Sequence, residues 1–151
     1  MFSKALDMTI REATPDDSAV LLQLLDQLGY PTLTLEDTRS NLRKHRDPDY
    51  CILVGEIDGH VVAFITLHVF HVLHWRAPFG RISSFCVEEG FRSKGAGRQL
   101  LHAGEEWLQA RGCAKIEVTS NARRIRAHQF YLNLGYSEDS RRFTKYLKGN
   151  K

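Results

Sequence analysis

A short basic turn between residues 87 and 101 carries the clearest chemistry in the sequence. It follows an apolar run that ends at Val87 and enters a helix with a strong apolar pattern. A helix N-terminus leaves backbone N–H groups unpaired and carries partial positive charge, so it favours an anion. The glycines also allow a close approach of the backbone to a bulky group. The pattern predicts a phosphate or pyrophosphate site made by Arg92, Ser93, Lys94, Gly95, Ala96, Gly97 and Arg98.

Other phosphate-binding loops fit this turn poorly. No Gly-Lys-Ser/Thr follows at the spacing of a Walker A loop, and the full G-x-G-x-x-G dinucleotide fingerprint is missing. A Gly-x-Gly turn before a helix also occurs simply as a cap. The turn alone therefore indicates an anion but does not identify it.

Two motifs resemble those of the GNAT superfamily of acetyl-CoA-dependent N-acetyltransferases. Arg92-x-x-Gly95-x-Gly97 is similar to the Arg/Gln-x-x-Gly-x-Gly/Ala signature, and residues 127–136 are similar to the Ala-x-x-Phe/Leu-Tyr-x-x-x-Gly-Phe/Tyr segment. The resemblance implies that the turn cradles the pyrophosphate of acetyl-CoA. More narrowly, residues from about 50 to 147 resemble the aminoalkylphosphonate N-acetyltransferases of bacterial phosphonate-utilisation operons. The features that carry this resemblance are Leu67-His68 with His71 and His74, Thr119-Ser120-Asn121, Arg124, Ala127-His128 and Arg142-Phe143-Thr144-Lys145.

The resemblance also implies roles for individual residues. The exposed backbone of the central strand, Phe85, Cys86 and Val87, would pair with the thioester carbonyl and the pantetheine amide. Tyr131 would protonate the leaving thiolate as a general acid; otherwise it is a helix aromatic that packs beside its neighbours. Asn121 would contact the cofactor, or else simply ends its strand.

The general base is left open by the sequence. Many superfamily members have a glutamate on the central strand where this chain has Ser84. The base is then Glu88, His68 or His128, or water relays the proton, or the amine arrives already deprotonated. We expect the substrate to contact His68, Ser84, Arg124 and His128, as the resemblance implies.

Two further groups of side chains could suggest a metal site or an acyl-enzyme, and we expect neither. His68, His71 and His74 could ligate a metal, but in an extended chain His71 points to the opposite face from the other two. Cys86 could form an acyl-enzyme, but the sequence supplies no histidine partner for it. We therefore predict no metal and a packing role for the Cys86 side chain.

Composition limits the class of protein. The chain has 151 residues, 42% hydrophobic and 26% charged, which suits one soluble globular domain. Its net charge of +3 suits an anionic small molecule better than a nucleic acid. Three cysteines without metal spacing indicate a reducing compartment, so we expect a cytoplasmic protein. No apolar stretch is long enough to span a membrane.

Periodicity and turn residues predict an α/β fold. Strands are expected over 8–12, 50–57, 60–69, 81–87, 115–120 and 143–147, with Asp58-Gly59 as a hairpin turn. Helices are expected from Thr14 to Gly29, over 34–46, from the glycine turn to about 111, and over 125–134. We predict one GNAT-like domain over 8–148, preceded by a short extension over 1–7. Its mixed, mostly antiparallel sheet would be flanked by about four helices.

The sequence thus predicts an N-acetyltransferase that moves acetyl from acetyl-CoA to a primary amine of a small molecule, possibly an aminoalkylphosphonate. Two alternatives stay open: an acetyltransferase of protein N-termini or lysines, and a non-catalytic acyl-CoA binding module. A homodimer is compatible with the sequence. The acceptor amine itself cannot be read from the residues.

Overall fold

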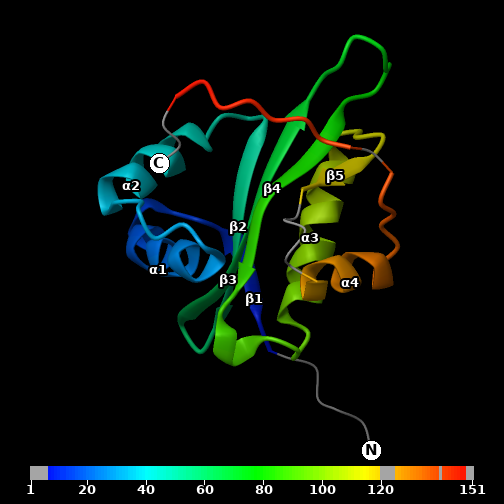
Figure 1. The fold of residues 1–151 in the computed structure, drawn as a ribbon. Coiled ribbons are helices and arrows are strands. Elements are labelled where there is room, and N and C mark those ends of the chain that lie inside the picture. Colours follow the sequence, from blue (N-terminus) through cyan, green and yellow to red (C-terminus); the bar gives the residue numbers. More distant parts are fainter. Residues whose placement is uncertain (1–6, 120–124, 140, 149–151) are drawn as a thin grey trace, which may run out of the picture. The chain divides into compact units, whose positions relative to one another are not determined.

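The computed structural model describes residues 7–119, 125–139 and 141–148. Contacts divide the chain into two units, Met1–Val118 and Thr119–Lys151. The described strands all belong to the first unit (Figure 1): β1 (Thr9–Glu12), β2 (Tyr50–Ile57), β3 (His60–Phe70), β4 (Phe79–Val87) and β5 (Ile116–Val118). The first unit also holds α1 (Ser18–Leu28), α2 (Leu35–Lys44) and α3 (Ala96–Ala110), whereas α4 (Ile125–Asn133) lies in the second.

The sheet is mixed and mostly antiparallel, as predicted. Its order is β1-β2-β3-β4-β5, and among the described strands only β4 and β5 run parallel to each other. β2 and β3 form the expected hairpin, because Asp58 and Gly59 take positive φ angles of 50° and 79°. The predicted α/β fold class is confirmed.

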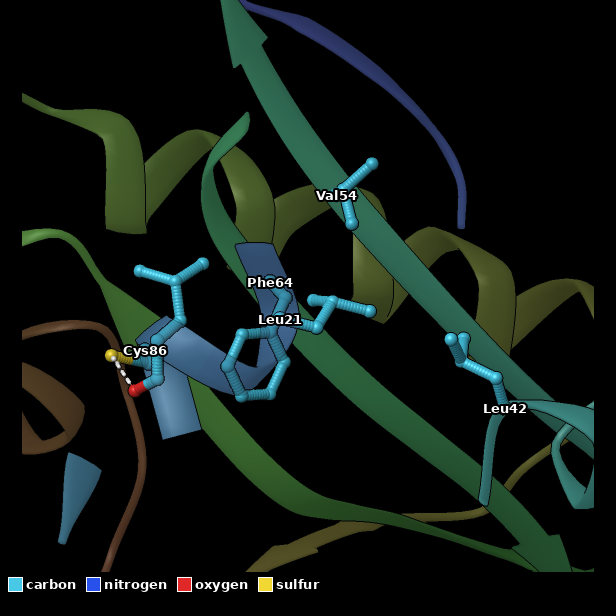
Figure 2. Close-up of a cluster of buried hydrophobic side chains, with 6 residues drawn as sticks. Leu21, Leu42, Val54, Phe64 and Cys86 are labelled. Carbon is cyan, nitrogen blue, oxygen red and sulfur yellow. Dashed lines mark hydrogen bonds between the residues drawn. The ribbon is translucent and has the colours of Figure 1, made fainter. Parts of the chain in front are cut away.

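Helices cover both faces of the sheet. α1 and α2 pack on one face, where Leu21, Leu24 and Leu42 meet Val54, Phe64 and Cys86 in a buried cluster (Figure 2). α3 packs on the other face through a glycine. A methyl group at Gly104 would lie only 3.2 Å from the side chains of Ile65 and Leu67. We call the face under α1 and α2 the acceptor face below, and it is formed by alternate residues of each strand.

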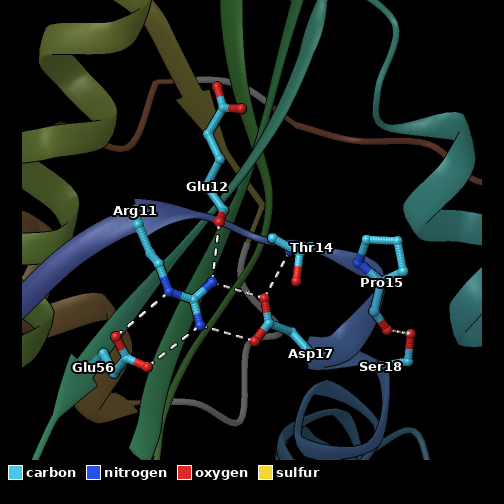
Figure 3. Close-up of polar contacts among 7 residues, drawn as sticks. All are labelled: Arg11, Glu12, Thr14, Pro15, Asp17, Ser18 and Glu56. Atoms are coloured by element: carbon cyan, nitrogen blue, oxygen red, sulfur yellow. Dashed lines mark hydrogen bonds and ion pairs between the residues drawn. The ribbon is translucent and has the colours of Figure 1, made fainter. Parts of the chain in front are cut away.

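A charged network fixes the entrance to α1. Arg11 on β1 donates two hydrogen bonds of 2.9 Å to the carboxylate of Asp17, which also accepts from the Thr14 amide at 2.7 Å (Figure 3). The guanidinium also reaches Glu56 on β2 at 3.4 Å. Thr14 is the N-cap and Pro15 the first residue, as predicted, but of a short 3-10 turn, Pro15–Asp17, and α1 itself begins at Ser18. Gly29 ends it with a φ of 116°.

Several predicted boundaries were wrong. α2 ends at Lys44 rather than Arg46, β4 begins at Phe79, and β5 covers only Ile116–Val118. The larger error is the strand expected over 143–147, because no strand is found within 141–148. Phe143 and Leu147 are 92% and 88% exposed. Their spacing suits a strand, but a strand also needs a neighbouring ladder, which periodicity does not reveal.

None of the helices in the described ranges combines the length and apolar character needed to cross a bilayer.

Candidate active site

The C-terminal half of β4 extends past its pairing with β5. The register of the parallel pair runs from Gly80 opposite Ile116 to Ile82 opposite Val118, where β5 ends. The predicted donor-binding residues lie farther along, and they pair with β3 on their other side: Phe85 with Ile65, Cys86 with Phe64 and Val87 with Ala63. Within the described residues, β4 and β5 therefore pair only before the predicted thioester site.

The basic turn leads directly into α3. Ser93 and Gly95 take positive φ angles of 64° and 91°, and Gly95 is the N-cap of the helix. The first helical bond is donated by the Gln99 amide to the Gly95 carbonyl at 3.1 Å. The three preceding amides, those of residues 96–98, belong to the first turn, where helical geometry supplies no acceptor. Gly97 lies in this turn and adds no side chain over it.

Three exposed cations surround this helix end: Arg92, Lys94 and Arg98. Like charges gathered at the positive end of a helix dipole repel one another, and a bound anion would relieve that repulsion. One of these cations is tied to the strand. Arg92 Nε donates a hydrogen bond of 2.9 Å to the Val87 carbonyl, which joins the turn to the end of β4.

Ser84 lies on the acceptor face in a cluster of hydroxyl groups. Thr66 Oγ1 is 2.6 Å from Ser84 Oγ and 2.7 Å from Ser83 Oγ. The pairing of β3 with β4 is irregular here, because Thr66 lies opposite Ser84 while Leu67 lies opposite Ile82. This bulge leaves two consecutive serines facing one threonine.

A hollow of about 130 Å³ opens beside these hydroxyls, between the sheet and helices α1 and α2. Its polar lining consists of Thr38, Asn41, Thr66 and Ser84, and the rest is apolar: Leu21, Leu25, Leu33, Ile52 and Phe64. A larger hollow of about 450 Å³ lies at the other edge of the sheet, where Glu12, Trp107 and Arg111 are among its lining residues. The smaller hollow adjoins the predicted thioester site, because Ser84 directly precedes Phe85 on β4.

His68 lies farther along the acceptor face. Its ring stacks on Tyr50, with centroids 4.1 Å apart, and lies 5.6 Å from the ring of Phe70. Burial lowers the pKa of His68, and the positive charge of Arg81 lowers it further. Arg81 pairs with His68 across the strands and lies 4.7 Å from the Phe70 ring centroid.

The three histidines do not converge. His71 and His74 belong to the loop after β3, whereas His68 is within the strand. Among the described residues, no group of three histidine, cysteine, aspartate or glutamate side chains is placed to hold a metal ion.

The Cys86 side chain packs against α1. It is 3% exposed, and its thiol donates to the Leu24 carbonyl at 3.4 Å (Figure 2). This position gives the thiol a structural partner in the core. Only the backbone of Cys86 is left as a predicted contact for the donor.

The second unit holds the other predicted residues. Tyr131 and His128 lie half-buried on α4, and the Tyr131 ring is 5.4 Å from Phe130 and 5.5 Å from Tyr136. The Tyr136 amide donates to the Tyr131 carbonyl at 3.0 Å as the helix ends. Asn121 and Arg124 lie outside the described residues.

Sequence reasoning did not indicate that Thr66, Ser83 and Arg81 lie beside the predicted site residues Ser84 and His68. Two consecutive serines on a predicted central strand could have indicated a polar position. The sequence could not indicate that both hydroxyls meet Thr66, because that depends on the bulge. Arg81 looked like the first residue of the strand, and only the register places it beside His68.

Comparison with known proteins identifies the family. The model of the acetyltransferase (GNAT) family matches residues 18–136. The chain is 32% identical over 139 residues to an aminoalkylphosphonate N-acetyltransferase of Salmonella typhimurium, covering 91% of this chain and 90% of that protein. It is 29% identical over 139 residues to an aminoglycoside N(6')-acetyltransferase type 1 of Stenotrophomonas maltophilia, covering 88% of each.

A solved structure shares the fold. An aminoglycoside N-acetyltransferase, AAC(6')-Iy, in complex with CoA superposes with a TM-score of 0.81 at 18% identity, over 98% of this chain and 99% of that chain. The family match spans most of the chain, and both curated relatives act on small molecules. The non-catalytic alternative is thereby set aside. The chain belongs to the GNAT acetyltransferase family and is a small-molecule N-acetyltransferase that uses acetyl-CoA as its acetyl donor.

Proposed function

We propose that the acceptor is the primary amine of an aminoalkylphosphonate. The observation that carries this proposal is the 32% identity to the Salmonella typhimurium enzyme, which extends over nearly the full length of both chains. An acceptor of this kind carries an amine at one end and an anionic phosphonate at the other. The site should therefore offer an amine pocket and a cation at a short distance from it.

The acceptor face has both features in the first unit. Ser84 borders the small hollow, and Arg81 lies on the same face of β4, because their partners Thr66 and His68 are two residues apart on β3. The Arg81 guanidinium lies 3.2 Å from Glu117 and remains half-exposed. A guanidinium recognises a planar pair of oxygen atoms well, so we assign Arg81 as a contact for the phosphonate.

The donor would bind along the edge of β4 that faces away from β3, beyond the end of its pairing with β5. We propose that the first-turn amides of α3, with Arg92, Lys94 and Arg98, hold the pyrophosphate of acetyl-CoA. The backbone of residues 85–87 would then bind the pantetheine arm and polarise the thioester carbonyl. Asn121 stays a predicted contact of the donor.

The reaction requires a neutral amine. The amine nitrogen attacks the thioester carbonyl carbon, the C–N bond forms, the C–S bond breaks, and the nitrogen loses a proton to water. The thiolate of CoA takes up a proton, for which we assign Tyr131 as the source, and Tyr131 regains a proton from water after the transfer. The products are an N-acetylated phosphonate and free CoA.

An aminoglycoside is the second candidate acceptor, since a relative at 29% identity has that activity. Aminoglycosides are polycations, which bind best to carboxylates. The residues lining the small hollow are uncharged, and the cation Arg81 lies nearby on the same face. These charges favour an anionic acceptor.

A panel assay tests the proposal. Free thiol release would be followed with aminoalkylphosphonates, with alkylamines of equal chain length, and with an aminoglycoside. We expect the highest kcat/KM for an aminoalkylphosphonate. A clear preference for a neutral amine or an aminoglycoside would contradict it.

A pair of variants locates the phosphonate contact. Arg81→Gln should lower kcat/KM for the phosphonate about tenfold or more, because a charge-assisted bond is lost, and should leave the matched alkylamine nearly unchanged. Arg43→Gln removes the same charge from the exposed surface of α2 and should alter neither acceptor. Equal losses for both acceptors in Arg81→Gln would remove this residue from the phosphonate site.

We also propose a cytoplasmic location, because Cys51, Cys86 and Cys113 are all free thiols. A homodimer remains a prediction that sedimentation would test.

A further inference from the structure

The cluster on the acceptor face consists of hydroxyl groups alone, which suits a neutral amine better than an ammonium ion. Thr66 is 7% exposed and is the common partner of both serine hydroxyls. It also lies 3.4 Å from the Ser84 carbonyl oxygen, to which it can donate. Three hydroxyl groups within one bulge provide several lone pairs and several rotatable protons, but no formal charge.

The cluster borders both the hollow and the predicted thioester site. Thr66 and Ser84 line the hollow of about 130 Å³, which has room for an amine with a short carbon chain, since a water molecule in the liquid occupies roughly 30 Å³. Ser84 directly precedes Phe85 on β4. An amine held by these hydroxyls would therefore lie beside the segment that we propose for the thioester.

The surroundings disfavour a positive charge at this place. All nine residues that line the hollow are uncharged. Next along the acceptor face lie Arg81, which is positive, and His68, whose pKa is lowered by burial and by Arg81. The ring of Tyr50 stacks on His68.

The carboxylates of the surrounding elements are exposed or paired with a cation. Asp26, Glu36 and Asp37 on the covering helices and Asp47 and Asp49 before β2 are exposed to solvent, Asp17 is bound to Arg11, and Glu117 on β5 lies 3.2 Å from Arg81. Glu88 follows the end of β4 and is half-buried. An ammonium ion in a partly buried, uncharged site without a counter-ion is disfavoured, whereas a neutral amine can both accept from and donate to a hydroxyl.

We propose that Thr66, Ser83 and Ser84 form an uncharged cradle that binds the acceptor nitrogen as the neutral amine, so that the enzyme selects acceptors by the pKa of their amino group. This inference rests on the proposed function for the position of the acetyl donor. The ammonium ion loses its proton to water before binding, and the bound neutral amine then attacks the thioester. At a fixed pH, the neutral fraction falls tenfold for each unit that the amine pKa rises above the pH. Amines with a low pKa are therefore favoured at neutral pH.

The pH dependence of kcat/KM tests the cradle. Profiles would be measured for alkylamines and aminoalkylphosphonates with well-separated amine pKa values. We expect kcat/KM to rise tenfold per pH unit up to a break that follows the pKa of each acceptor. A break at one pH for all acceptors would overturn the proposal, because a group on the protein, such as His68 or Glu88, would then take the proton.

Variants of the cluster give an independent test. Thr66→Val keeps the shape and removes the hydroxyl, so acceptor kcat/KM should fall roughly 3- to 10-fold while acetyl-CoA affinity is unchanged. Thr66→Ser should retain most of the activity, and Thr9→Val on the exposed strand β1 controls for the same change elsewhere. Unchanged acceptor kinetics in a folded Thr66→Val protein would overturn the proposal.

Ser84→Glu should allow the acceptor to bind as the ammonium ion. The new carboxylate can hold an ammonium ion and accept its proton, so the break should move to a lower pH that is the same for every acceptor. A break in this variant that still follows the acceptor would contradict the assigned role of Ser84. If alkylamines react and aminoalkylphosphonates do not, the phosphonate is not the acceptor. The pH profiles of the alkylamines then still test whether the cluster binds the neutral amine.

Discussion

Arg92 Nε donates a hydrogen bond of 2.9 Å to the backbone carbonyl of Val87, the last residue of β4. The first residue of the basic turn is thereby attached to the end of the strand that we propose for the thioester. Because α3 begins only four positions later, this contact also sets how its N-terminus lies relative to β4. Arg92 can thus contribute to acetyl-CoA binding both through its positive charge and through the hydrogen bond that holds the turn to β4.

Arg92→Gln should weaken acetyl-CoA binding by about tenfold or more, because the cation beside the pyrophosphate and the hydrogen bond to Val87 are lost together. Isothermal titration calorimetry would measure the change in Kd. Arg43→Gln makes the same change of net charge at an exposed ion pair on α2 and should leave the Kd unaltered. If the two variants bind alike, the turn does not hold the pyrophosphate through Arg92.

A second prediction concerns the backbone of the same turn. Gly97→Val places a branched side chain over the first-turn amides of α3, so acetyl-CoA affinity should fall by about tenfold or more with the fold intact. Gln109→Val introduces the same residue on the exposed last turn of α3 and serves as its control. An unchanged affinity in a folded Gly97→Val protein would show that the backbone here makes no close contact with the donor.

The network of Arg11 and Asp17 predicts acid sensitivity. Its hydrogen bonds with Arg11 hold the pKa of Asp17 below the usual value, so its stabilising effect is complete above the unfolded-state pKa of 3.8. It is lost as the pH falls from that value through the lowered pKa of the folded state. We therefore expect the free energy of unfolding to decrease over this acidic range.

Asp17→Asn tests this dependence. The variant should be less stable at pH 7 by about 1–2 kcal/mol, a modest value because the Arg11 side chain is 34% exposed and screened by water. It should also lose part of the stability change between neutral and acidic pH. Urea unfolding at several pH values would measure both effects. Parallel curves for the two proteins would mean that Asp17 is not the group that titrates.

Local signals predicted most of the secondary structure. Asp58-Gly59 predicted its hairpin and Gly29 predicted the end of α1, because positive φ angles restrict the choice of residue. The two GNAT-like motifs predicted the turn before α3. The expected strand over 143–147 failed because its residues carry a strand pattern that says nothing about a partner.

The acceptor face could not be predicted from the sequence to the same extent. Thr66 and Ser83 are 17 positions apart and meet only because one extra residue is inserted in β4. The register of a strand pair depends on packing over its whole length, and a shift of one residue would turn these hydroxyls away. Arg81 and His68 share a face for the same reason.

The role of Tyr131 gives the last prediction. CoA is a good leaving group, so its departure does not strictly need a proton donor, and general acid catalysis typically contributes about 10² to 10⁴ in rate. Tyr131→Phe keeps the ring, which packs near Phe130 and Tyr136, and removes only the hydroxyl. A catalytic role predicts a kcat lower by roughly two orders of magnitude with acetyl-CoA affinity little changed.

The comparison must isolate the chemical step. Single-turnover rates with the best acceptor, measured across pH, avoid the case in which product release limits kcat and hides the loss. Tyr136→Phe removes a hydroxyl from the neighbouring ring and should leave the rate nearly unchanged. If Tyr131→Phe matches the parent protein at every pH, the ring serves packing alone, and the thiolate leaves unprotonated or takes its proton from another group.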